Sequence, residues 1–182
     1  MELILITGGA RAGKSRYAQA RAAELGEDDV SFIATATASD DEMRARIERH
    51  RTDRPARWEC IEAPTQIGDA IAACRHDTIL LDCVTMLAAN ALLGAHARSG
   101  AEAEDAVAAE VRGIVNALTA RSGTLLAVTN EVGLAVHPPT ALGRWYQDAL
   151  GRANQRLAAS AAEVVLVVSG LPLVLKPAGR RA

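Results

Sequence analysis

The sequence predicts an α/β protein with one mainly parallel β-sheet and helices on both of its faces. Short apolar runs alternate with segments of helical periodicity along the whole chain. The first apolar run leads directly into a glycine-rich loop and then a helix, as in a strand–loop–helix unit. The chain contains no internal repeat and no linker, so we expect residues 1–182 to form a single domain.

The glycine-rich loop fits the pattern G-x-x-x-x-G-K-[ST]. It consists of Gly8, Gly9, Ala10, Arg11, Ala12, Gly13, Lys14 and Ser15. The apolar run 3–6 before it predicts a buried strand, and residues 15–25 after it have helical spacing. Backbone N–H groups of such a loop and the following helix N-terminus bind phosphate oxygens. Lys14 would reach the β- and γ-phosphates and the Ser15 hydroxyl would bind Mg²⁺, so the loop predicts a nucleoside triphosphate site.

Composition and charge argue against nucleic-acid binding, a membrane span, secretion and a cysteine metal or redox site. A net charge of −2 gives no general attraction to nucleic acid, and no apolar run is long enough to cross a membrane. The loop starts at Gly8, which leaves no room for a signal peptide, so we expect a cytoplasmic protein. Cys60, Cys74 and Cys83 match no metal or redox spacing and are expected to be reduced core residues.

The second predicted strand is the apolar run 30–34, which ends in small residues. Loops at the carboxyl ends of parallel strands line the ligand crevice of an open α/β sheet. Ala34, Thr35 and Ala36 are therefore candidate nucleotide contacts. From this stretch alone, an ordinary strand end is an equally good interpretation.

The next predicted helix begins at a capping box, Ser39 to Glu42, and stops at Pro55. It is rich in arginine, with Arg44, Arg46, Arg49, Arg51, Arg54 and Arg57. A solvated basic face is the usual explanation, but beside a triphosphate site guanidinium groups match phosphate oxygens. His50 lies on the same segment, where a packed histidine is commoner than a catalytic one.

Two further strands end in acidic residues. The run 58–63 predicts a short strand with Glu62 near its end, which could accept hydrogen bonds from a guanine edge or simply face water; spacing alone favours water. A helix with a Thr65 cap should follow. The run 78–82 ends in Asp82, which would hold Mg²⁺ or else cap the next helix, predicted over 85–96.

The remaining chain completes the sheet. An amphipathic helix is expected over 102–120 and another strand over 125–128. The polar loop 129–133, continuing to Pro139, follows that strand and is a place for a second substrate. After a helix that begins near Thr140, a strand over 164–168 should turn into an antiparallel edge strand over 173–175.

Several of these segments together resemble one enzyme family. They are Thr7–Ser15, Asp40–Met43 with Arg46, Ile47 and His50, Arg54–Pro55 with Trp58, Leu80–Cys83, Val128–Gly133, Asn154–Ala158 and Val167–Gly170. The chain is similar from Leu3 to Lys176 to the bifunctional adenosylcobinamide kinase/adenosylcobinamide-phosphate guanylyltransferases of cobalamin biosynthesis.

The resemblance implies a RecA-like P-loop fold, a homotrimer, and two reactions. ATP or GTP would phosphorylate adenosylcobinamide, and GMP would then pass from GTP through a guanylyl-histidine to adenosylcobinamide phosphate. His50 matches the guanylylated histidine of the family. The further matching nucleotide contacts are Arg51, Thr52, Asp53, Arg54, Glu62 and Asp82.

Two alternatives remain open from the sequence. A plain P-loop small-molecule kinase would form no covalent nucleotide adduct at His50. A nucleotide-dependent switch module would usually carry an N-K-x-D segment for guanine, and this chain has none.

Overall fold

A computed structural model of the chain describes residues 1–38, 41–52 and 55–179. Within 41–52 it describes side chains only for Asp41, Arg44, Ala45, Ile47, Glu48 and Arg51. The elements are β1 (Glu2–Thr7), α1 (Lys14–Gly26), β2 (Val30–Ala34), α2 (Asp41–Thr52), β3 (Glu59–Glu62), α3 (Ile67–Ala73), β4 (Thr78–Asp82), α4 (Val84–Gly94), α5 (Gly100–Ala120), β5 (Thr124–Val128), the 3₁₀ helix η1 (Val132–Leu134), α6 (Ala141–Ser160), β6 (Glu163–Val168) and β7 (Leu171–Lys176).

The described strands form one seven-stranded sheet in the order β3-β2-β4-β5-β1-β6-β7. All neighbouring pairs are parallel except β6 and β7, which are antiparallel. Both the mainly parallel sheet and its antiparallel carboxyl-terminal edge strand are as predicted. Because six of these strands run in one direction, their carboxyl ends meet along a single edge of the sheet.

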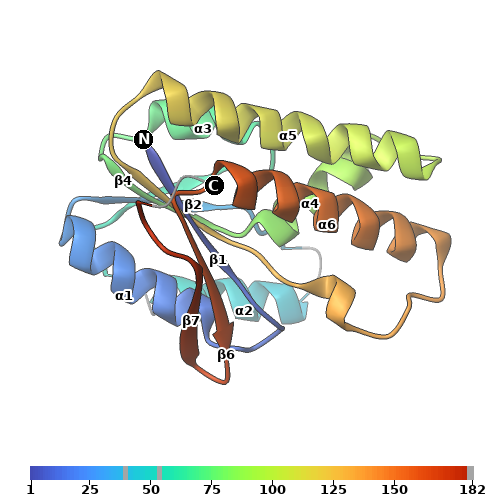
Figure 1. The fold of residues 1–182 in the computed structure, drawn as a ribbon, viewed down its shortest axis with the longest axis horizontal. Helices are drawn as coiled ribbons and strands as arrows, with labels where there is room; N and C mark the ends of the chain where they lie inside the picture. The colour runs from blue at the N-terminus through green and yellow to red at the C-terminus, as the bar shows by residue number, and fades with distance from the viewer. Residues whose placement is uncertain (39–40, 53–54, 180–182) are drawn as a thin grey trace.

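Helices cover both faces of the sheet, which confirms the predicted class (Figure 1). On one face, small side chains of α1 such as Ala18 and Ala22 pack against the buried apolar side chains that the central strands point toward α1. Figure 1 shows α2 on the same side. The opposite face is covered by α3, α4, α5 and α6, whose Ile67, Leu87 and Ile114 belong to the larger of the two core clusters.

Two local predictions are wrong. Helix α3 begins at Ile67, after a left-handed Gln66, so Thr65 is not its cap. Instead the Glu110 carboxylate of α5 accepts hydrogen bonds from the N–H groups of Gln66 (2.8 Å) and Ile67 (3.0 Å). Cys60 is exposed rather than buried, because β3 is an edge strand on which exposure alternates.

The cysteines are free thiols, as expected: Cys74 is buried and Cys83 is half-buried. Among the residues that the structure describes, no helix is long and apolar enough to cross a membrane.

Candidate functional site

The phosphate loop lies at the carboxyl edge of the sheet, between β1 and α1. Gly13, at φ 98°, is the N-cap of α1, and Lys14 is the first residue of the helix. The Lys14 side chain is buried, and its Nζ donates a hydrogen bond to the carbonyl of Gly9 at 2.6 Å. The ammonium group is therefore folded over the loop that would hold phosphate.

Glycine is required at two points where another segment touches this loop. At Gly8, with φ 148°, a Cβ atom would lie 2.3 Å from the carbonyl oxygen of Val167. At Gly13 it would lie 3.2 Å from the Cα of Gly170. The N–H of Gly170 also donates to the carbonyl of Ala12 at 2.8 Å. The turn between β6 and β7 thus holds the phosphate loop from the side.

A cavity of about 580 Å³ opens beside the loop, and six of the predicted site residues line it. Its predicted members are Ser15, Ala34, Ala36, Arg51, Glu62 and Asp82. The other lining residues, not individually predicted as site residues, are Phe32, Thr37, Ala38, Arg44, Ile47, Glu48, Pro64, Cys83, Thr85, Met86 and Asn130. Of these, Arg44 lies in the arginine-rich helix and Asn130 in the polar loop after β5, both of which the sequence singles out as possible substrate contacts; Ile47 and Cys83 belong to segments that carry the family resemblance.

Asp82 does not occupy the capping position of the following helix. The N-cap of α4 is Cys83, one residue later. Asp82 instead lines the same cavity as Ser15 of the phosphate loop. A hydroxyl and a carboxylate oxygen on one cavity wall are the ligand types that Mg²⁺ accepts, with phosphate oxygens and water completing its shell.

Thr35 and Cys83 tie the ends of β2 and β4 together behind this wall. Thr35 is buried, and its Oγ1 accepts from the N–H of Cys83 and donates to the Cys83 carbonyl, both at 2.8 Å. Its hydroxyl is therefore committed to the fold. Burial, and secondarily the Asp82 charge, raises the pKa of the Cys83 thiol to about 11. Cys83 is thus a protonated thiol at neutral pH and a poor nucleophile.

The helix α2 forms another part of the cavity wall through Arg44, Ile47, Glu48 and Arg51. His50 lies in this helix, immediately before Arg51. The His50 and Thr52 side chains and all of Asp53 and Arg54 lie outside the described residues.

The arginine cluster divides accordingly. Arg44 and Arg51 line the cavity, although Arg44 also pairs with Asp41 at 2.6 Å. Arg57 does not line the cavity. It pairs with Asp28 at 2.6 Å on the surface, as expected of a solvated basic residue.

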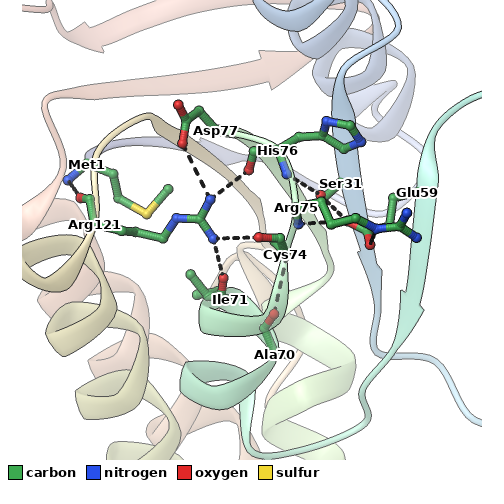
Figure 2. A network of polar contacts seen from close by, with 10 residues as sticks. All are labelled: Met1, Ser31, Glu59, Ala70, Ile71, Cys74, Arg75, His76, Asp77 and Arg121. Carbon is green, nitrogen blue, oxygen red and sulfur yellow. Dashed lines mark hydrogen bonds and ion pairs between the residues drawn. The ribbon is translucent and has the colours of Figure 1, made fainter.

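A second cavity, of about 630 Å³, lies between α3 and α5 at the amino edge of the sheet. Its wall includes Arg121, whose guanidinium donates to the carbonyls of Ile71 (2.7 Å), Cys74 (3.0 Å) and His76 (2.9 Å) (Figure 2). Arg121 thus binds the carboxyl end of α3 and the turn before β4. Among the described residues, none that is predicted as a nucleotide contact lines this cavity.

Beside this cavity Glu59 forms a second polar cluster. It accepts hydrogen bonds from Ser31 Oγ, from the Arg75 N–H at 2.9 Å and from Arg75 Nε at 2.7 Å. Burial acts to raise the pKa of Glu59, but these hydrogen bonds outweigh it and lower that pKa to about 2.

Comparisons with known proteins identify the family of this chain. Residues 4–175 match the family model of cobinamide kinase / cobinamide phosphate guanyltransferase. The bifunctional adenosylcobalamin biosynthesis proteins CobU of Escherichia coli and of Salmonella typhimurium are 39% and 40% identical, each over 96% of this chain and 99% of theirs. CobP of Pseudomonas aeruginosa, with the same description, is 38% identical over 94% of this chain and 96% of its own.

Among solved structures, the flagellar accessory protein FlaH of Methanocaldococcus jannaschii matches 97% of this chain and 79% of its own. The sequence identity is 15% and the TM-score is 0.49. This similarity is too low to support a conclusion about function. The family model and the three curated relatives cover nearly the whole chain. This chain therefore belongs to the family of bifunctional cobinamide kinases and cobinamide phosphate guanyltransferases.

Proposed function

We propose that this chain uses ATP or GTP to phosphorylate adenosylcobinamide and then transfers GMP from GTP, through a guanylyl-histidine at His50, to adenosylcobinamide phosphate. One observation carries the proposal. A single cavity joins Ser15 of the phosphate loop, Asp82, Glu62 and the helix α2, which contains His50. Membership of the family supports both reactions.

In the kinase step the corrinoid hydroxyl attacks the γ-phosphorus of the triphosphate. The new O–P bond forms as the bond to the β-phosphate oxygen breaks, and the nucleoside diphosphate leaves. Lys14 and the backbone N–H groups of Gly8–Ser15 would stabilise the charge on the phosphate oxygens. Mg²⁺, held by Ser15 and Asp82, would neutralise further phosphate charge.

In the guanylyl step a nitrogen of His50 attacks the α-phosphorus of GTP and pyrophosphate leaves. A phosphate oxygen of adenosylcobinamide phosphate then attacks the same phosphorus, the P–N bond breaks, and His50 is regenerated. Cys83 does not compete as a nucleophile, because its pKa of about 11 keeps it protonated at neutral pH. An unperturbed imidazole, with a pKa of about 6.5, is largely neutral and nucleophilic at that pH.

Glu62 is the proposed guanine contact. It is exposed at the end of β3 and lines the cavity, and a carboxylate accepts hydrogen bonds from the two N–H groups of a guanine edge. Arg51, also on the wall, is a proposed phosphate contact, as are Thr52, Asp53 and Arg54 beyond it by resemblance to the family.

We also propose a homotrimer. Large apolar side chains are exposed on the β6–β7 hairpin, including Val168, Leu171 and Leu173, and an interface would cover them. A solution mass equal to that of a single chain, 19.1 kDa, would refute the trimer.

The guanylyl-histidine is tested by incubating the protein with α-³²P-labelled GTP and measuring acid-labile label on the chain. His50→Asn should abolish the label and retain most kinase activity. His96→Asn is the matched control, since His96 is exposed beyond the end of α4 that lies away from the cavity.

Label on His50→Asn would refute His50 as the nucleophile. Normal kinase turnover with no label on the wild-type chain would favour the plain kinase instead.

A further inference from the structure

The strand β5 lies between the phosphate-loop strand β1 and the strand β4 that ends in Asp82. Its last residue, Val128, is in register with Ile6 on β1 and with Asp82 on β4. The residues that follow β5 therefore emerge between the beginning of the phosphate loop and the proposed Mg²⁺ ligand. The order of the strands along the chain does not reveal this position, since β5 begins more than forty residues after β4 in the sequence.

The backbone that follows β5 is fixed on both sides of Asn130. The N–H of Thr129 donates to the carbonyl of Ile6 at 2.9 Å, and the N–H of Glu131 donates to the carbonyl of Gly8 at 3.2 Å. The carbonyl of Asn130 itself accepts from Asn154 Nδ2 at 3.0 Å. Asn130 is thus held relative to the first residues of the phosphate loop.

Side chains reinforce the same segment. Asn154, which is buried, accepts from Thr129 Oγ1 at 2.7 Å, and Glu131 accepts from Thr7 Oγ1 at 2.6 Å. These hydrogen bonds join β1, β5 and α6 around Asn130. A side chain on such a support is pre-organised for a ligand, because little rotational freedom of the backbone remains to be lost.

The Asn130 side chain itself is half-buried and lines the cavity together with Ser15 and Asp82. Among the hydrogen bonds of the described residues, none involves its amide group, whereas the Asn90 amide donates to the carbonyls of Thr35 and Pro64. The Asn130 amide therefore keeps two N–H donors for a ligand. Being uncharged, it does not repel a phosphate group as a carboxylate would.

We propose that Asn130 is a catalytic residue that donates a hydrogen bond to the γ-phosphoryl group during its transfer. This inference rests on the proposed kinase reaction. As the acceptor oxygen bonds to the γ-phosphorus and the bond to the β-phosphate oxygen breaks, charge shifts on the phosphoryl oxygens and Asn130 stabilises it. Asn130 exchanges no proton; the proton of the acceptor hydroxyl leaves to water.

The test compares Asn130→Ala and the isosteric Asn130→Asp with the wild-type protein and with Asn116→Ala. Asn116 is an exposed asparagine on α5 and lines the opposite cavity. Two quantities are measured: kcat of cobinamide phosphorylation, and the ratio of the dissociation constants of GDP and of the β,γ-imido analogue of GTP. The melting temperature and GDP binding report whether each variant is folded.

Asn130→Ala should lower kcat on the order of 10²–10³-fold. It should also lower the preference for the triphosphate analogue over GDP by about tenfold, with GDP affinity unchanged. Asn116→Ala should change neither. If Asn130→Ala fails to fold, Asn130→Asp decides, because it keeps the shape, lacks the donor and should lose still more of the triphosphate preference.

Wild-type kcat and an unchanged preference in a folded Asn130 variant would overturn the inference. A wild-type protein without activity on cobinamide would instead refute the proposed function. In that case the affinity ratio alone still tests whether Asn130 contacts the γ-phosphate.

Discussion

The two edges of the sheet carry cavities of similar size, about 580 Å³ at the carboxyl edge and about 630 Å³ at the amino edge, yet their polar groups differ. At the amino edge, Arg121 and Glu59 are bonded to backbone and side-chain partners of the same chain (Figure 2). At the carboxyl edge, Asn130 and Glu62 present polar groups to the cavity, beside a glycine-rich loop.

This difference teaches that volume does not identify a functional site. A guanidinium whose donors are satisfied by carbonyls stabilises the fold and has little left to offer a ligand. The phosphate loop requires glycine at Gly8 and Gly13, whose positive φ angles are unfavourable for other residues, and a phosphate-binding function explains this requirement. Substitutions of polar side chains at the two edges should therefore separate activity from stability.

The largest expected effect is that of Lys14→Ala. Loss of the buried ammonium at the phosphate loop should reduce both half-reactions on the order of 10²–10⁴-fold, equivalent to several kcal/mol. Steady-state rates of phosphoryl and guanylyl transfer measure it. Lys176→Ala is the control: Lys176 is the only other lysine in the sequence and donates to carbonyls at the end of α6. Normal turnover of Lys14→Ala in either reaction would show that the loop is not the shared site.

The next effect distinguishes two glycines of the loop. Gly8→Ala should destabilise the protein on the order of 2–4 kcal/mol, since its Cβ would meet the Val167 carbonyl at a left-handed backbone position. A Cβ atom at Gly9 would have no atom of the described residues within 4 Å, so Gly9→Ala should melt as the wild type does. Thermal melts of both variants test this. Equal melting temperatures would mean that the β6–β7 turn does not constrain the loop.

Glu62→Gln should weaken guanine recognition more than triphosphate binding. Replacing a charged acceptor by an amide removes a charge-assisted hydrogen bond of roughly 1.5–3 kcal/mol. Binding of GTP and of ITP, which lacks the exocyclic amine, measures it in wild type and variant. If the ratio of the GTP and ITP affinities is unchanged, Glu62 does not contact guanine and is only a solvated surface residue.

At the amino edge, Glu59→Gln should lower stability and leave kcat unchanged. Hydrogen bonds hold the pKa of Glu59 at about 2 in the folded protein, below its ordinary value of 4.5. The carboxylate therefore stabilises the fold above about pH 4.5, by about 1–2 kcal/mol once screening at the exposed Arg75 is allowed for, and this stabilisation is lost as the pH falls toward 2.

Urea unfolding of wild type and Glu59→Gln between neutral and acidic pH measures the difference. It should be largest at neutral pH and shrink on acidification. A difference independent of pH would show that the carboxylate charge contributes nothing.

The sequence predicted the fold because its signals are local. Apolar runs such as 78–82 and 125–128 have the length of buried strands and are shorter than a typical buried helix, and the glycine loop marks the first strand–helix junction. The prediction for the start of α3 was wrong because of a tertiary contact: the Glu110 carboxylate of α5 replaces the local cap. Nothing near Thr65 in the sequence could reveal that partner.

Local signals likewise predicted part of the candidate site. Ser15, Glu62 and Asp82 stand at the ends of predicted strands or in a motif, and the structure brings them to one cavity. Asn130 lay within a loop suspected of binding a second substrate, but its place between Gly8 and Asp82 follows from the strand order. Strand order is set by long-range packing, which a single sequence does not display.

The most direct test of the contrast between the two edges is a crystal structure with Mg²⁺ and the β,γ-imido analogue of GTP. We expect the triphosphate on the backbone of Gly8–Ser15, Mg²⁺ at Ser15 and Asp82, and the guanine in the cavity near Glu62. A nucleotide bound in the cavity beside Arg121, with the phosphate loop empty, would contradict this account.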